Sequence, residues 1–321
     1  MPAPLDIAEL VGRAREGQQR AVARLISLVE DAHPQLREVA KALTPYTGNA
    51  RIVGLTGPPG VGKSTSTSAL LTALRGEGKR VGVLAIDPSS PFSGGALLGD
   101  RIRMTEHATD SGVFIRSMAT RGHLGGLAWA TPQAVRVLDA AGFDVVLIET
   151  VGVGQSEVDV VKLADTTVVL LAPGMGDGIQ AAKAGVLEIA DVFVVNKADR
   201  DGADTTVHDL KQMISYGRKE IRGQSWRQPI VRTVASKGEG VGDVVAALDD
   251  HRAWLDAQGE LTRRRVARAT SEVEAIALNS LRVELGHLRG GEELTALARR
   301  VVDRDLDPYA AADKLVGDLK T

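Results

Sequence analysis

Between Arg51 and about Leu255, short apolar runs alternate with segments in which apolar residues recur at helical spacing. Several runs are apolar almost throughout, which favours central strands of a parallel sheet covered on both faces. The runs read RIVGLTG, RVGVLAID, GVFIRSM, DVVLIET, TTVVLLA, VFVVNK and PIVRTVAS. Strand followed by helix, repeated, predicts an α/β fold with a doubly wound, mostly parallel sheet. In such sheets, ligands bind at the carboxyl ends of the strands.

Both ends of the chain show helical patterns without strands. Near the N-terminus, Val22, Leu25, Ile26 and Val29 recur at helical spacing. A C-terminal stripe could comprise Leu261, Val266, Ala269, Val273, Ile276 and Leu281. We therefore expect a helical extension at 1–46, an α/β domain at 47–255 and a second helical extension at 256–321. A stripe that cannot fully pack on a finished domain suggests a partner, such as a second copy of the chain.

A glycine-rich segment, GPPGVGKST, lies between a strand pattern and a helix pattern. It matches the phosphate-binding loop G-x-x-x-x-G-K-[ST], whose amides turn toward phosphates at the positive end of the following helix. Lys63 is expected to reach the β- and γ-phosphates, and the Ser64 hydroxyl can bind magnesium. The residues that we expect around the nucleotide phosphates are Gly57, Pro58, Pro59, Gly60, Val61, Gly62, Lys63, Ser64 and Thr65.

The tetrapeptide NKAD follows the run VFVV and favours guanine as the base. The Asp199 carboxylate can accept hydrogen bonds from guanine N1–H and the 2-amino group, a donor pair that adenine lacks. Asn196 would meet the N7 and O6 side of the purine, and the stem of Lys197 would cover the ring. A backbone amide near Val234, Ala235 and Ser236 is expected to contact guanine O6. The alternative is an ordinary helix start at 196–199.

Acidic residues at other strand ends are candidates for the magnesium side of the site. Glu149 ends the run DVVLIE, where a buried carboxylate would be costly without a partner, and magnesium is its natural partner. The Gly152 amide could bond the γ-phosphate, so that the following segment would move when this phosphate leaves. Asp87 and Asp100 could hold magnesium or order the attacking water. Helix or turn capping remains the alternative for all three acids.

The composition limits the classes of partner. Net charge is −2 and there is no cysteine, so we expect a cytoplasmic protein without disulfides or thiolate metal sites. No apolar stretch approaches the roughly 18 residues that cross a bilayer, so no membrane association is expected. The arginines at 263–265 could suggest nucleic acid, but a solvated helix face is favoured because no aromatic residues interleave with them.

Taken together, these motifs resemble the MeaB/ArgK/MMAA-type G proteins. The matching strings are GPPGVGKST, AIDPSSPFSGGALLGDRIRM, SMATRGHLGGLA, IETVGVGQSE and NKAD, with ISLVED in the N-terminal extension. The resemblance covers nearly the whole chain. An older label for the same family is a kinase of lysine, arginine and ornithine transport.

The resemblance implies a P-loop GTPase that uses GTP/GDP and Mg²⁺. It also implies a homodimer joined through the C-terminal helices. Family members look like chaperones of adenosylcobalamin-dependent acyl-CoA mutases, chiefly methylmalonyl-CoA mutase, and gate cofactor loading or reactivate the enzyme. A third switch corresponds to PGMGDGIQAAKAG at 173–185, where GDGIQAAK replaces the GDELQGIK typical of the family. The resemblance marks His123, for which the residues suggest no role.

Two other functions stay open from the sequence. One is a metal-insertion GTPase of a related branch, although such proteins usually carry Cys or His ligands near a switch. The other is a kinase linked to basic amino acid transport, which would need an acceptor site and a lid. No glutamine is clearly placed to orient water, and Gln155 is only one possibility, so slow hydrolysis accelerated by a partner is expected.

Overall fold

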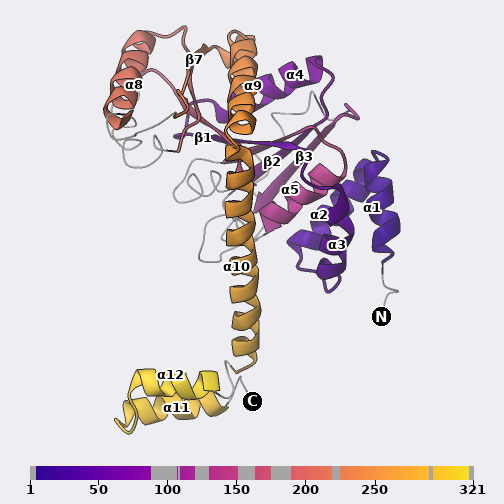
Figure 1. The fold of residues 1–321 in the computed structure, drawn as a ribbon, viewed down its shortest axis with the longest axis vertical. Helices are drawn as coiled ribbons and strands as arrows, with labels where there is room; N and C mark the ends of the chain where they lie inside the picture. Colours follow the sequence, from indigo (N-terminus) through magenta and orange to yellow (C-terminus); the bar gives the residue numbers. More distant parts are fainter. Residues whose placement is uncertain are drawn as a thin grey trace. The chain divides into compact units, whose positions relative to one another are not determined.

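The computed structural model describes residues 5–87, 107, 109–119, 130–150, 163–174, 189–218, 225–288 and 292–317 (Figure 1). The chain divides into two compact units, residues 1–262 and residues 263–321. The first unit contains the sheet, and the second is helical.

A seven-stranded sheet forms the centre of the first unit, with all of its strands parallel. Its order is β3-β2-β4-β1-β5-β6-β7, so β1 lies between β4 and β5. All seven predicted runs form strands, which confirms the doubly wound α/β fold. The bounds are β1 Arg51–Thr56, β2 Val81–Asp87, β3 Val113–Ala119, β4 Val145–Thr150, β5 Thr166–Leu171, β6 Val192–Asn196 and β7 Ile230–Thr233.

Helices cover both faces of the sheet, as the apolar strands require. On one face, α4 (Lys63–Gly76) and α9 (Val241–Ala257) pack against apolar side chains of β1, β2 and β4–β6. On the other face, α5 (Ala130–Ala140) and α8 (Ala203–Arg218) pack against the alternate side chains of the strands. In Figure 1, α4 and α5 lie on opposite sides of the strands β1 and β2.

Three N-terminal helices extend the second layer over α5. They are α1 (Ile7–Arg15), α2 (Gln19–Glu30) and α3 (Leu36–Leu43). The predicted stripe on α2 is buried, with Leu25, Ile26 and Val29 each 0% exposed. A short 3₁₀ helix, Thr44–Tyr46, follows α3.

The connection between α3 and β1 is held by Asp139 of α5. Its carboxylate accepts hydrogen bonds from the backbone amides of Gly48, Asn49 and Ala50 at 2.5, 3.1 and 2.8 Å. The connection is therefore fixed to the domain, because a carboxylate that accepts several amide hydrogen bonds is strongly tied to them.

The second unit continues α10 (Glu260–Leu288) and adds α11 (Glu292–Val302) and α12 (Pro308–Gly317). On α10, Leu261 is buried, whereas Val266, Val273 and Ile276 are 59%, 66% and 38% exposed. Most of the predicted stripe thus faces solvent in the single chain. Within the described residues, no helix is both long and apolar enough to span a membrane.

Candidate nucleotide-binding site

The glycine-rich segment connects β1 to α4 and places its residues at the carboxyl end of the central strand. Gly57 has φ +145°, and a Cβ there would lie 2.3 Å from the carbonyl oxygen of Leu170 in the neighbouring strand β5. Gly62 caps α4 with φ +93°. Only glycine adopts such angles readily in so little space, so the loop geometry depends on both residues.

Lys63 begins α4 and is only 7% exposed. Its ammonium group donates to the carbonyl oxygens of Gly57 and Pro58, at 2.6 and 3.1 Å. The side chain thus folds back over the glycine-rich loop. An ammonium held at the concave side of such a loop, beside the N-terminus of a helix, favours an anionic ligand.

Ser64 and Glu149 meet at the base of this loop. The Ser64 hydroxyl donates to Oε1 of Glu149 at 2.6 Å, and the two residues are 8% and 2% exposed. Glu149 lies near the end of β4, in register with Leu55 of β1, which brings the predicted metal-side acid next to the phosphate loop. Two buried oxygen ligands this close suit Mg²⁺, which is often held by few protein groups together with phosphates and water.

Asn196 connects three segments at the end of β6. Its Nδ2 donates to the carbonyl oxygen of Val61 at 2.8 Å. Its Oδ1 accepts from the Thr233 hydroxyl at 3.2 Å and from the Ala235 amide at 3.0 Å. Because Asn196 is 3% exposed, these bonds fix the relative positions of the glycine-rich loop and of the loop after β7.

Lys197 and Asp199 follow on the solvent side. Lys197 has φ +57°, and its ammonium donates to the carbonyl oxygen of Gly60 at 2.7 Å. The Asp199 carboxylate lies 3.4 Å from the ammonium of Lys237, with both side chains about half exposed at 44% and 56%. An exposed pair of this kind contributes little to stability, so the carboxylate is available to a ligand.

Two of these residues, Thr233 and Lys237, were not predicted from the sequence. Thr233 ends β7, and Lys237 belongs to the 3₁₀ helix Ala235–Lys237 that follows it. Their position at the carboxyl end of the last predicted strand could have pointed to them, because the other site residues also lie at the carboxyl ends of strands.

Three amides of the loop after β7 already have partners. The Val234 amide donates to the carbonyl oxygen of Glu239 at 3.0 Å, and the Ala235 amide donates to Asn196. The Lys237 amide donates to the carbonyl oxygen of Val234 at 2.8 Å. Ser236 lies between Ala235 and Lys237 in the 3₁₀ helix that follows β7.

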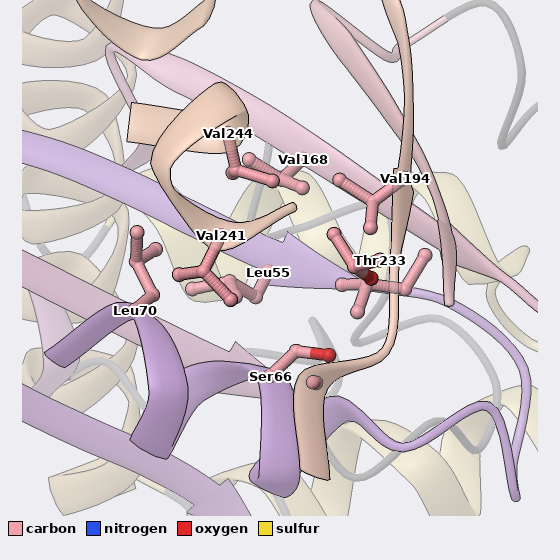
Figure 2. A pocket seen from close by; sticks show the side chains of 10 residues that line it. Leu55, Ser66, Leu70, Val168, Val194, Thr233, Val241 and Val244 are labelled. Carbon is pink, nitrogen blue, oxygen red and sulfur yellow. The ribbon is translucent and has the colours of Figure 1, made fainter. Parts of the chain in front are cut away.

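A small cavity of about 20 Å³ lies beneath this loop, between α4 and α9 (Figure 2). Figure 2 shows Ser66 and Leu70 of α4, Val241 and Val244 of α9, and Thr233 around it. This space can hold about one water molecule. The Ser66 hydroxyl is buried without a hydrogen-bond partner in the described part of the chain. The side chains between the loop after β7 and the helices α4 and α9 are therefore not fully packed.

The structure thus brings together several predicted residues at the carboxyl ends of the strands. They are the residues of 57–65, Glu149, Asn196, Lys197, Asp199 and Val234–Ser236. Asp87 ends β2 next to β4, but its side chain is not described. Asp100, Gly152, Gln155 and His123 lie outside the described residues, as does most of the predicted third switch, from residue 175 onward.

A sequence model of the family "Methylmalonyl Co-A mutase-associated GTPase MeaB" matches residues 22–287. A protein of Pyrococcus abyssi, whose assigned name is no more specific than GTPase, is 50% identical over 98% of this chain and 97% of its own length. GTPase ArgK of Escherichia coli is 35% identical, over 92% of this chain and 90% of its own.

A mouse protein named methylmalonic aciduria type A homolog, mitochondrial, is 36% identical over 95% of this chain and 78% of its own. Among solved structures, a crystal structure titled LAO/AO transport system kinase is similar with a TM-score of 0.70 and 28% identity. That similarity covers 99% of this chain and all of the other.

Proposed function

Because the chain belongs to the MeaB family of GTPases, we propose that it is a GTP-dependent chaperone of an adenosylcobalamin-dependent acyl-CoA mutase. The favoured partner is methylmalonyl-CoA mutase. The membership itself establishes a guanine-nucleotide-binding GTP hydrolase. The observation that carries the proposal is the match to a family named for its association with this mutase, over residues 22–287.

The contacts of the glycine-rich loop support a role for it in binding the phosphates of GTP. When phosphates enter, the Lys63 ammonium would exchange the carbonyl oxygens of Gly57 and Pro58 for phosphate oxygens. This exchange keeps the buried cation hydrogen-bonded in both states. Lys63 would then neutralise the charge that develops on the transferred phosphoryl group.

We assign Ser64 and Glu149 to Mg²⁺. Their oxygen atoms lie 2.6 Å apart in a buried position at the start of α4, which supports a shared hard cation. When bound, Mg²⁺ would neutralise charge on the β- and γ-phosphates. Asp87, Asp100 and Gly152 remain proposed members of the same side of the site, with Gly152 as the γ-phosphate sensor.

We assign the base to Asn196, Lys197, Asp199 and the loop after β7. Asp199 would exchange the Lys237 ammonium for guanine N1–H and the 2-amino group. Val234 and Ala235 already use their amides within the protein, so the contact to guanine O6 falls to the Ser236 amide. Adenine would present its amino group to that amide and would leave the Asp199 carboxylate without donors.

The same proposal includes a cytoplasmic homodimer. The exposed apolar side chains of Val266, Val273 and Ile276 on α10 support a contact between two chains. Among the described residues, no group of three or more His, Cys, Asp or Glu side chains could hold a metal ion.

The proposal is tested by mixing the protein with a candidate mutase and measuring GTP hydrolysis and complex formation. We expect a complex whose affinity depends on GTP versus GDP, and a faster hydrolysis rate when the mutase is present. The coupling must be reciprocal, so the mutase must also change the affinity for nucleotide. The variant Lys63→Ala should lose the nucleotide-dependent part of the response. No complex and no change in rate with methylmalonyl-CoA mutase would contradict the proposed partner.

A further inference from the structure

Three aromatic rings meet at the amino ends of the strands that carry the base-binding residues. The ring of Trp226, which precedes β7, lies 4.8 Å from the His251 ring and 5.8 Å from the Trp254 ring, measured between centroids. His251 and Trp254 lie on α9, and their rings are stacked with an interplanar angle of 13° at 6.0 Å. We call these three residues the aromatic clasp. Such ring pairs each add about 1 kcal/mol beyond the burial of their surface.

Hydrogen bonds tie the clasp to two neighbouring strands. The Trp226 indole N–H donates to the carbonyl oxygen of Asp191 at 2.7 Å, directly before β6. Nδ1 of His251 is hydrogen-bonded to the Thr166 hydroxyl at the start of β5, at 2.9 Å. Nε2 of His251 lies 3.3 Å from Oδ1 of Asp191. His251 is 0% exposed, so solvent does not weaken these contacts.

The opposite ends of these strands carry the proposed guanine site. Asn196 ends β6, and the loop of Val234–Ser236 follows β7. Only short strands separate the clasp from this site, because β7 has four residues and β6 has five. Since β7 lies at the edge of the sheet, it is hydrogen-bonded only to β6, and it has little strand pairing of its own to fix its position.

Asn196 holds the loop after β7 on the side of β6, but the packing between this loop and the helices α4 and α9 is incomplete. The cavity bordered by Thr233 and Ala235 leaves room that core packing would otherwise fill (Figure 2). On the far side of the loop, α9 runs back along the sheet to the clasp and packs against β5, β6 and β7. The loop is thus the turn of a β7–α9 unit whose two free ends are joined by Trp226, His251 and Trp254.

We propose that the aromatic clasp positions the guanine-recognition loop, with Trp226 as its positioning residue. By holding β7 and α9 together at one end, the clasp sets where the Ser236 amide lies at the other end. The inference rests on the proposed guanine contacts of Ser236 and Asp199. It adds a residue that never touches the nucleotide but determines how well the site recognises guanine O6.

The test compares nucleotide affinities of wild type, Trp226→Ala and Trp226→Phe. The probes are GDP, the diphosphate of 2-aminopurine riboside, which keeps the 2-amino group but lacks O6 and the N1–H, and ADP. Phe143→Leu is the matched control, because Phe143 is 2% exposed in the core on the other face of the sheet. Thermal unfolding of each variant shows how much of a change in nucleotide affinity reflects a loss of stability alone.

We expect Trp226→Ala to weaken GDP binding by roughly tenfold, the value of about one hydrogen bond, while the 2-aminopurine analogue loses little. Trp226→Phe keeps an aromatic ring and loses the N–H. It should recover most of the GDP affinity that Trp226→Ala loses. Phe143→Leu should lower thermal stability without changing the ratio of the two affinities. An equal loss for both probes in Trp226→Ala, or no loss for either, would overturn the role of the clasp.

The wild-type protein tests the underlying proposal separately. If it binds GDP no better than ADP, the proposed guanine site is wrong, and the positioning role fails with it. If it prefers GDP and that preference is unchanged in Trp226→Ala, only the inference about the clasp is overturned.

Discussion

At the scale of single residues, the contact between Ser64 and Glu149 accounts for the length of the acid at the end of β4. The glutamate oxygen reaches the hydroxyl directly, at 2.6 Å. An aspartate on the same strand would be shorter by one methylene, so its carboxylate would stop about one bond length away. The longer side chain therefore allows a direct contact where a shorter acid would require a bridging water or a metal-bound water.

A second acid, Asp110, is held by the helix that follows the glycine-rich loop. Arg75, in the last turn of α4, donates to both Asp110 oxygens, at 2.8 and 2.9 Å. The Arg75 guanidinium, and next the Gly112 amide, lower the pKa of the Asp110 carboxyl from its ordinary value of 3.8. Gln19 of α2 donates to the carbonyl oxygen of Asp110 at 3.3 Å, so this segment also joins the N-terminal helices to the domain.

The lowered pKa of Asp110 predicts how its contribution to stability depends on pH. A depressed pKa in the folded state stabilises the protein above the unfolded pKa, and this contribution is lost as the pH falls through the folded value. Urea unfolding should therefore show Asp110→Asn to be less stable than wild type above about pH 5. The difference should shrink progressively below about pH 4. A difference that stays constant from neutral to acid pH would contradict this role of the Arg75–Asp110 pair.

At the scale of elements, the glycine-rich loop and strand β6 are held together by Asn196 and Lys197. The contact leaves no space for a side chain at Gly62, where a Cβ would lie 2.6 Å from Nδ2 of Asn196. Gly60 lies in the same loop with φ +80°, but a Cβ there would meet nothing within 4 Å. Substituting Gly60 would therefore report only the cost of a left-handed backbone. Substituting Gly62 would report this cost together with that of a steric clash.

Replacing each glycine by alanine tests this distinction. Both Gly60→Ala and Gly62→Ala should lose about 1 kcal/mol or more in the free energy of unfolding, because alanine is strained at positive φ. Gly62→Ala should lose about 1–2 kcal/mol more, since it displaces the Asn196 amide from the Val61 carbonyl. Urea unfolding without nucleotide measures both values. Equal losses would mean that Asn196 adapts to the added methyl group at no cost.

The elements differ in how far the sequence determined them. The strands were predictable because burial on both faces makes each of them almost entirely apolar. The place of the motif residues was predictable because ligands bind at the carboxyl ends of parallel strands. The bonds of Asn196 to Val61 and Ala235 were not, since they join residues 135 and 39 positions apart. The clasp was also missed, because Trp226 meets His251 only after α9 has folded back along the sheet.

At the scale of the whole molecule, the chain combines a nucleotide-binding unit with a helical second unit whose apolar side chains are exposed. Val266, Val273 and Ile276 recur at a spacing that places them on one side of α10, since a helix turns roughly 100° per residue. Ser271 falls on the other side of the same helix and is exposed. An apolar stripe on an exposed helix favours contact with another helix.

Charged substitutions on this stripe test the proposed dimer. Val273→Glu combined with Ile276→Glu should weaken association at least tenfold, because a buried carboxylate without a partner is costly. Light scattering should then give the 33.9 kDa of a single chain, whereas wild type and Ser271→Glu should give twice this mass. A wild-type protein that remains a monomer, or a double variant that remains a dimer, would contradict the interface.

The proposed guanine site, on which the nucleotide-dependent functions rest, is tested most directly by the base preference of Asp199→Asn. An asparagine amide can still accept from N1–H, but it donates toward the 2-position, where guanine carries an amino group and xanthine an oxygen. We predict that GDP affinity falls roughly 10- to 100-fold, that XDP affinity rises, and that Asp201→Asn, an exposed neighbour, behaves as wild type. Unchanged GDP and XDP affinities in Asp199→Asn would contradict the site.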